Sequence, residues 1–427
     1  MRDILMGLSQ PSFTLGIEEE YLLVDKTSRD LVSDPPQELL TDCEEALREI
    51  GGGQVSPEFM RSQIEVGTGV CKNIKEARSE LARLRNAVVT NAARYGFAPI
   101  ASSTHPFAEW DAQRHTDKER YNVIVADLQM IAQRMLISGM HVHVGIDDDE
   151  LRIDIMNQAS YFLPHLMALS TSSPFWRGRQ TGLKSYRLSI FDELPRTGLP
   201  EHFSSYSEYQ RTVDVLVNAG LIEDGTKIWW DMRPSARFPT LEMRVTDICP
   251  LLDDGIAIAA LFLCLCRMMY RLRGLNQRWR SYSPFLIMEN RWRAQRYGVT
   301  NGLVDFGKSE LVPFRDLLDE ILALIREDAD ALNCRLEVEH TRLIVERGTS
   351  AERQVAAYET ALAAGSGEQA ALQAVVDLLI AETVRGTAED DPMQPAETLA
   401  PDGAAAEPVH PAPEAGPAII LPDSSPC

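Results

Sequence analysis

The chain has 427 residues, of which 44% are hydrophobic and 25% are charged, the composition of an ordinary globular protein. Its formal net charge of −21 argues against binding to a nucleic-acid backbone as the main task, so we expect no nucleic-acid partner. A chain of this length can form two or three average domains, or one large domain with a tail.

The first predicted strand runs from Phe13 to Asp25 (FTLGIEEEYLLVD). Apolar and polar residues alternate along it, which places Glu18 and Glu20 on the polar face and leaves Glu19 out of phase. Residues two positions apart on a strand lie roughly 7 Å apart. Two carboxylates at this spacing are costly unless a proton or a cation lies beside them. The alternative for this pair alone is a solvated acidic edge.

The rest of the chain alternates between predicted helices and strands. The first elements are a helix at Pro35–Ile50, a strand at Ser62–Gly67, a helix at Ile74–Tyr95, a strand at Phe97–Ser102, a helix at Arg120–Met135, a strand at Met140–Ile146 and a helix at Leu151–Leu169 that Pro164 can bend. They are followed by a basic loop at Ser172–Arg196, a helix at Tyr206–Ala219, two strands within Lys227–Thr246, and helices at Ile256–Gly274, Pro284–Tyr297, Val312–Leu332 and Ala351–Thr383.

The segment from Gly386 to Cys427 differs in composition from the rest of the chain. It is rich in Pro and Ala, contains no Lys or Arg, and carries −8 of the net charge. This composition is typical of disorder. We therefore predict one α+β domain over residues 1–385 and a disordered acidic tail over residues 386–427.

The cysteines and the apolar segments bear on the cellular location. The seven cysteines show no CxxC spacing, and several lie in apolar runs, as expected of reduced thiols in the cytosol. Met1–Gln10 has no apolar core typical of a signal peptide. The most hydrophobic stretch, Ile256–Cys266, is too short to span a bilayer and predicts a buried helix capped by Asp253 or Asp254. We expect a cytoplasmic protein without a membrane partner.

Three later strands repeat the polar pattern of the first. The pairs that share a face are Gln63 with Glu65, His141 with His143, and Glu242 with Arg244. One antiparallel sheet with an apolar face on helices and a polar face toward a site explains all four strands. Its four glutamates (Glu18, Glu20, Glu65 and Glu242) would repel one another strongly without cations. Carboxylate oxygens suit Mg²⁺ or Mn²⁺, and Mg²⁺ often bridges to substrate phosphates.

The two histidines of the HxH pair permit a different interpretation. Two imidazoles on one strand face can ligate zinc in a hydrolase. The other six histidines form no spaced set, however, and the charged neighbours are glutamates. We favour His141 as a magnesium ligand or phosphate contact, and the sequence leaves open which of His141 and His143 contacts the metal.

Phosphate binding would have to rely on metal ions and arginines. The sequence contains no GxxxxGK[ST] motif, and no GxGxxG lies between a predicted strand and helix. Arg can hold phosphate oxygens with two hydrogen bonds at once. The candidates are Arg177, Arg179, Lys184 and Arg187 of the basic loop, together with Arg244. An exposed loop without this role is the alternative for the first four.

Four motifs together resemble the carboxylate–amine ligase family, in its type 2 glutamate–cysteine ligase group. They are GIEEEYLLVD (Gly16–Asp25), SGMHVHVGI (Ser138–Ile146), SPFWRGRQTGLKSYR (Ser173–Arg187) and WWDMRPSARFPTLEMRVTD (Trp229–Asp247). The resemblance covers about Ser12 to Val384. It implies a glutamine-synthetase-like α+β fold, in which a curved antiparallel sheet packed on helices forms a funnel over Mg²⁺ and ATP.

The resemblance also implies roles for individual residues. Glu18, Glu20, Glu65, His141 and Glu242 fall where the wider superfamily has metal ligands, and Arg244 falls where an arginine meets phosphate. The implied reaction phosphorylates a carboxylate with ATP and lets an amine displace the phosphate, with Glu242 and Arg244 as the catalytic pair. In the named group the acid is glutamate and the amine is cysteine. No residue in this sequence can be assigned to recognition of the thiol of cysteine.

Two other functions remain open from the sequence. One is a divalent-metal hydrolase that uses His141 and His143, and the other is a phosphotransferase that shares the fold. A homo-oligomer also remains open.

Overall fold

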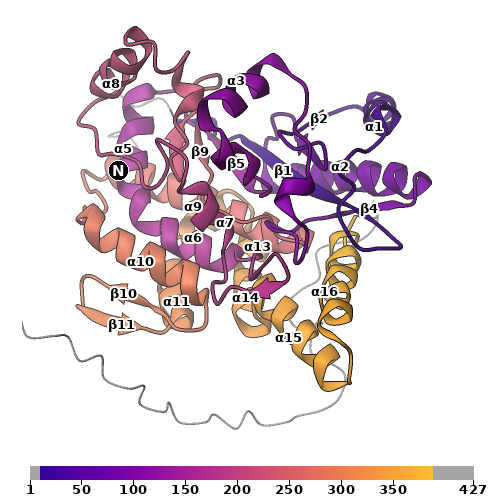
Figure 1. Cartoon of the computed structure of the whole chain (residues 1–427). Helices are drawn as coiled ribbons and strands as arrows, with labels where there is room; N and C mark the ends of the chain where they lie inside the picture. The colour runs from indigo at the N-terminus through magenta and orange to yellow at the C-terminus, as the bar shows by residue number, and fades with distance from the viewer. Residues whose placement is uncertain (1–9, 388–427) are drawn as a thin grey trace, which may run out of the picture. The chain divides into compact units, whose positions relative to one another are not determined.

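Strand β1 (Leu15–Asp25) lies at the centre of a seven-stranded antiparallel sheet (Figure 1). The computed structural model describes residues 10–387, so the predicted tail lies outside the described residues except for its first two positions. The strand order is β2-β3-β1-β5-β9-β8, and β4 pairs with the last residues of β1. The other strands of this sheet are β2 (Gln54–Pro57), β3 (Gln63–Gly67), β4 (Phe97–Ile100), β5 (Met140–Gly145), β8 (Met232–Pro234) and β9 (Thr240–Met243).

Helices make up most of the remaining described chain. Those in the first half are α1 (Gln37–Ile50), α2 (Ile74–Arg94), α3 (Glu119–Leu128), α4 (Met130–Gln133), α5 (Asp149–Ala159), α6 (Leu163–Ser170), α7 (Arg187–Phe191) and α8 (Tyr206–Asn218). Those in the second half are α9 (Leu252–Gly274), α10 (Pro284–Tyr297), α11 (Phe314–Leu324), α12 (Arg326–Ala331), α13 (Arg335–Glu339), α14 (Thr341–Arg347), α15 (Ser350–Ala363) and α16 (Glu368–Thr383). Two hairpins, β6 (Phe175–Trp176) with β7 (Arg179–Gln180) and β10 (Leu303–Asp305) with β11 (Glu310–Val312), lie outside the main sheet.

The predicted strands are present, but four of the predicted helices are divided, including Val312–Leu332, which is split at Ile325 into α11 and α12. Gln129, with φ of 51°, separates α3 from α4, and Gly365, with φ of 91°, lies between α15 and α16. Helical backbone does not pass through a positive φ, so each run ends there. Pro164 lies in the first turn of α6, where proline is well tolerated, and a single 3-10 turn (Ser160–Phe162) joins α6 to α5, so the predicted helix is interrupted just before the proline.

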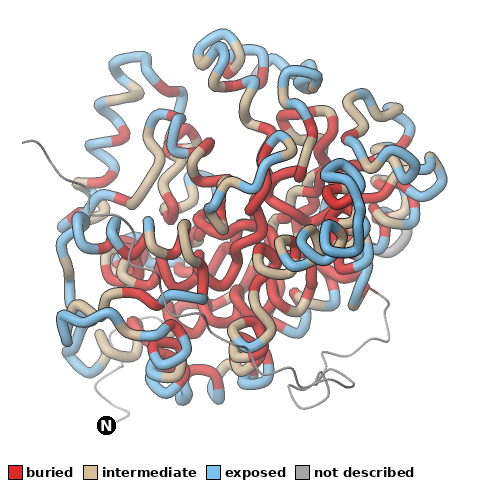
Figure 2. Tube along the Cα trace, turned by 60° about the horizontal axis from the view of Figure 1, so that its bottom comes forward, coloured by how far each residue is buried: buried red, intermediate tan, exposed pale blue. Residues whose placement is uncertain are grey.

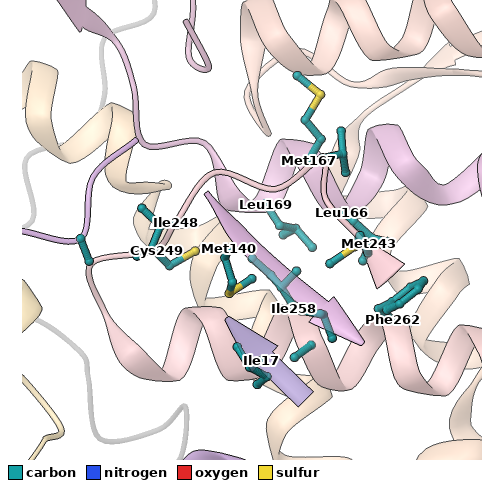
Figure 3. Close-up of a cluster of buried hydrophobic side chains, with 14 of the residues drawn as sticks. Ile17, Met140, Leu166, Met167, Leu169, Met243, Ile248, Cys249, Ile258 and Phe262 are labelled. Atoms are coloured by element: carbon teal, nitrogen blue, oxygen red, sulfur yellow. The ribbon is translucent and has the colours of Figure 1, made fainter. Parts of the chain in front are cut away.

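The apolar face of the sheet packs on α9 and α6. Ile17 of β1, Met140 of β5 and Met243 of β9 lie in one fully buried cluster with Ile258 and Phe262 of α9 (Figure 3). Buried residues continue through the centre of the trace, and exposed ones lie around its margin (Figure 2). Within residues 10–387, α9 alone has the length and apolar character of a membrane span, and 78% of its most apolar window is buried in the protein. This burial is that of a core helix.

The start of α9 differs from the prediction. Neither Asp253 nor Asp254 caps the helix, which begins at Leu252 without a side-chain cap. Asp254 is buried and pairs with His340 Nε2 at 2.9 Å and with Arg347 Nη2 at 2.7 Å, so it joins α9 to the α13–α14 segment. A cap requires an oxygen directed at the free amides of the first turn, and these ion pairs direct the carboxylate elsewhere.

Candidate active site

The polar face of the sheet collects the side chains that the four strand motifs predicted. Glu20 of β1 lies opposite Glu65 of β3, and Glu18 lies opposite His141 of β5. On the other edge of β5, His143 lies opposite Glu242 of β9. These positions share one face because side chains alternate along each strand, so the predicted metal ligands are close together although they come from distant parts of the sequence.

Three side chains on this face form a group that can hold a metal ion. One ligand atom from each of Glu18, His143 and Glu242 lies within 4.8 Å of the other two. His143 Nδ1 is hydrogen-bonded to the Thr240 hydroxyl at 2.9 Å, and its buried Nε2 has no hydrogen-bond partner. An oriented imidazole with one unused nitrogen and two carboxylates is a donor set that fits a divalent cation.

His141 lies next to this group. Its Nδ1 is 3.2 Å from Glu18 Oε2, and the ring is buried. Burial and the charge of Arg244 lower the pKa of His141 to about 4, so the imidazole is neutral at physiological pH. The sequence favoured His141 as the imidazole ligand, whereas His143 is the histidine that the structure brings into the three-residue group.

Glu18 and Glu242 are ionised despite their burial. Burial alone would raise the pKa of Glu18, but its contacts with His141 at 3.2 Å and His143 at 3.6 Å hold that pKa well below its usual range. Burial likewise opposes ionisation of Glu242, and the charges of Arg244 and Arg233 outweigh it, so the pKa of Glu242 is also well below its usual range. Both carboxylates therefore carry the charge that a metal ligand needs.

Glu20 and Glu65 behave in the opposite way. Burial and the nearby Glu58 raise the pKa of Glu20 to about 8, although Gly139 N–H donates to its Oε2 at 2.8 Å. Burial, with repulsion from Glu58, Glu18 and Glu20, raises the pKa of Glu65 well above its usual range. These carboxylates are crowded, and a cation between them would favour their ionised forms.

Two arginines contact Glu242. Arg244 pairs through Nη1 with Glu242 Oε1, which supports the expectation that these two side chains share a face. Arg233 of β8 donates from Nε to Glu242 Oε2 at 2.8 Å. Sequence reasoning missed Arg233, although it lies within the same motif, because the pairing of β8 with β9 brings it opposite Glu242.

The basic loop divides into two groups. Arg187 is buried and lines a small cavity on the polar face together with Glu20, His141 and Arg244. The other three predicted phosphate ligands do not line this cavity: Arg177 pairs with Glu109 at 2.5 Å, Arg179 is exposed in the β6–β7 hairpin, and Lys184 pairs with Glu352 at 3.1 Å.

Asp247 is a further residue of the site's framework. Its carboxylate accepts hydrogen bonds from Ser172 N–H at 2.9 Å and from the Ser173 and Ser185 hydroxyls at 2.8 Å. Ser173 in turn accepts a bond from the amide of Arg187 at 3.1 Å. The two ends of the basic loop are therefore joined at one buried carboxylate, directly beside the first residue of α7.

Sequence comparison assigns the chain to a known group. Residues 14–377 match the family model described as glutamate-cysteine ligase family 2. The chain is 59% identical over 377 residues to a protein of Rhodospirillum rubrum, covering 88% of this chain and 97% of that protein. It is 56% identical over 373 residues to one of a Jannaschia species, covering 87% and 97%. Both relatives are provisionally named glutamate–cysteine ligase 2.

Solved structures agree on the fold. A glutamate–cysteine ligase from Francisella tularensis in complex with AMP matches with a TM-score of 0.60 at 14% identity, over 88% of this chain and 90% of that one. A bifunctional glutathione synthetase from Pasteurella multocida matches with a TM-score of 0.62 at 16% identity, over 87% of this chain and 52% of that one. The expected glutamine-synthetase-like α+β fold, with an antiparallel sheet packed on helices, is confirmed.

Proposed function

Because the chain belongs to glutamate–cysteine ligase family 2, we propose that it joins a carboxylic acid to an amine and converts ATP to ADP and phosphate. The observation that carries the proposal is the joint presence, on one sheet face, of the Glu18–His143–Glu242 group and the buried arginines. The catalytic domain would comprise residues 1–385, acting in the cytoplasm, where its buried thiols remain reduced.

The proposed metal ligands are Glu18, Glu242 and His143 for one Mg²⁺ or Mn²⁺, with Glu20 and Glu65 available to a second. His141 would support Glu18 through their 3.2 Å contact. A bound divalent cation would neutralise phosphate charge and orient the transferred group. The chain's own part is to keep Glu18 and Glu242 ionised and to hold the His143 ring through Thr240.

The arginines would stabilise the charge that moves during phosphate transfer. In the proposed first step, an oxygen of the acid attacks the γ-phosphorus of ATP, giving an acyl phosphate and ADP. Arg244 is positioned by Glu242 and would meet the phosphate oxygens. In the second step the amine attacks the acyl carbon, and phosphate leaves. For the acid and the amine we propose glutamate and cysteine, with weak activity toward this pair.

The test is an ADP-release screen over pairs of acids and amines, with mass detection of the amide. Release of ADP that requires both substrates and Mg²⁺ would support the ligase. A phosphotransferase would instead give a phosphorylated product without an amide. A hydrolase would release product with Zn²⁺ in the absence of ATP, and its melting temperature would rise with Zn²⁺ and not with Mg-ATP.

A further inference from the structure

A small cavity of about 110 Å³ lies on the polar face of the sheet, between the sheet and helix α3. Its polar end is formed by Glu20, His141, Arg187 and Arg244. Groups proposed to take part in the reaction therefore line this cavity, so a molecule bound in it would be a substrate.

Arg187 is a buried cation without a direct ion pair. It is 2% exposed, and none of the ion pairs found among residues 10–387 includes its guanidinium, which Asp247 and Glu20 attract only from a greater distance. Its Nη2 donates to Arg244 O at 3.2 Å and its Nη1 to Val245 O at 3.4 Å, while its Nε has no partner. A buried charge in this state is costly, and a ligand carboxylate would satisfy it with two parallel hydrogen bonds.

The position of Arg187 is tightly defined. A Cβ added to Gly139 would lie 2.5 Å from Arg187 Nη2, so a larger residue there would displace the guanidinium from its present position. The amide of the same glycine donates to Glu20. A ligand carboxylate on Arg187 would therefore lie next to Glu20 and the proposed metal ligands, and a group on the neighbouring carbon would face the reaction centre.

The rest of the cavity is mostly apolar. Apolar and aromatic side chains supply most of this lining (Phe59, Ile124, Met135, Ile137, Phe191, Leu194 and Trp229), and Glu58, Gln63 and Tyr121 add polar groups to it. Such a wall favours a hydrocarbon side chain over a polar one of the same shape.

From these features we propose that the cavity binds the amine substrate, and that this amine is a small α-amino acid with an apolar side chain. Its carboxylate pairs with Arg187, its amino group faces Glu20 and the proposed acyl phosphate, and its side chain contacts the apolar wall. The assignment rests on the proposed ligase function for the role of the amine, and it predicts that cysteine is accepted only as a small apolar residue.

Calorimetric titration of the full chain tests the assignment, with Mg²⁺ and a non-hydrolysable ATP analogue present throughout. L-Valine and L-threonine have the same shape, and we expect valine to bind about 10- to 100-fold more tightly. L-Valinamide, which lacks the carboxylate, should bind at least about 10-fold more weakly than valine. Equal binding of threonine, or undiminished binding of valinamide, would overturn the proposal.

Variants separate the two parts of the cavity. Arg187→Met should abolish valine binding and Arg187→Lys should retain part of it, whereas Arg315→Met, at an exposed ion pair, should leave it unchanged. If Arg187→Met does not fold, Leu194→Asn still tests the wall, because it should reduce the preference for valine over threonine. Unchanged preference in Leu194→Asn would contradict the proposal.

The chemistry distinguishes this inference from the proposed function. In the presence of ATP and hydroxylamine, a valine hydroxamate would show that valine supplies the carboxylate and would overturn its role as the amine. If valine binds as expected but no acid–amine pair releases ADP, the proposed function and the amine role fail, and the cavity stands as a binding site for a small apolar amino acid. If glutamate and cysteine are ligated but valine does not bind, only the cavity assignment fails.

Discussion

Arg85 of α2 holds Glu19 of β1 through two hydrogen bonds, at 2.6 Å and 2.7 Å, on the helix-packed side of the sheet. Both side chains are completely buried, and Tyr21 O–H also donates to Glu19. The glutamate that breaks the alternation of the first motif is therefore not part of the polar face. It attaches the central strand to the helix behind it.

Replacing Arg85 with Leu should destabilise the protein by about 3–5 kcal/mol, because it leaves the Glu19 charge buried without its partner. Urea unfolding measures the change. The matched control is Arg94→Leu on the same helix, whose guanidinium is 62% exposed in its pair with Asp42 and should contribute less than about 1 kcal/mol. Equal losses in the two variants would contradict this account of Glu19.

Glu242→Gln and Arg244→Lys should both impair turnover. The first removes a charged ligand, so the Mg²⁺ concentration needed for ADP release should rise and kcat should collapse. Arg244→Lys retains the positive charge but cannot donate the two parallel hydrogen bonds of a guanidinium. We expect its kcat to fall by about 10²-fold or more. Glu223→Gln, at an exposed carboxylate, is the control.

Glu242→Gln should also lower the melting temperature, because Arg233 and Arg244 would then face each other without the carboxylate between them. The protein should still fold, since neither substituted side chain contacts the apolar cluster of the sheet. Near wild-type ADP release by both folded variants would show that the site is elsewhere.

His143→Gln should weaken Mn²⁺ binding more than His141→Gln, because His143 Nε2 is the unused nitrogen within the ligand group. Thr240→Val should have an intermediate effect of about 10- to 100-fold, since it removes the hydrogen bond that orients the ring. Titration with Mn²⁺, followed by electron paramagnetic resonance, measures all three. A larger loss in His141→Gln would reverse the ligand assignment in favour of the histidine that the sequence suggested.

The stabilisation by Mg²⁺ should grow as the pH rises from about 5 to 8. The folded-state pKa of Glu20 is about 8, above the usual carboxyl value, so the metal-free fold binds a proton that the unfolded chain has released. Its contribution to stability is present below the unfolded pKa and is lost as the pH rises toward 8. A cation that binds ionised Glu20 opposes this loss.

Melting curves across this pH range, with and without Mg²⁺, measure the difference. Buried His105 and His165, whose pKa values are lowered to about 4 by burial, destabilise the fold on acidification in both series and so cancel in the comparison. Glu20→Gln should reduce the pH dependence of the Mg²⁺ effect, and Glu65, whose pKa is also raised, should supply the remainder. A gap between the two series that stays constant from pH 5 to 8 would argue against Glu20 as a metal ligand.

Deletion of residues 388–427 should leave the melting temperature and ADP release unchanged. The reason is composition alone, since this acidic Pro/Ala-rich segment has too few large apolar residues to form a core. Aggregation or loss of turnover in the truncated protein would show that the segment contributes to the folded body.

The sheet and its polar face were largely predictable because strand side chains alternate strictly. That rule alone placed Glu18 with Glu20, and Glu242 with Arg244, on the correct faces. It says nothing of which strands pair. The choice between His141 and His143 depends on the register between β5 and β9, and the role of Arg233 depends on β8 lying beside β9.

The basic loop shows a second limit. Arg177 and Arg187 are both arginines of the same basic loop, and the sequence does not distinguish them. In the structure, however, the side chain of Arg177 is 45% exposed beside Glu109, and that of Arg187 is buried in the cavity. The difference arises because Asp247, far along the chain, binds the serines near both ends of the loop. Hydrogen bonds between residues far apart in the chain produce no periodic pattern in the sequence that could predict them. The space beside Gly139 that accommodates Arg187 is equally invisible in the sequence.

The strand order has a consequence for how the protein is synthesised. Glu18 and Glu242 lie more than two hundred residues apart, and the strand that carries Glu242 packs on α9, which follows it in the chain. We therefore expect the three-residue ligand group to assemble only after α9 has emerged, although β1 can pair with β3, β4 and β5 much earlier. A nascent chain that has not reached β9 carries Glu18, Glu20 and Glu65 but lacks the complete ligand group.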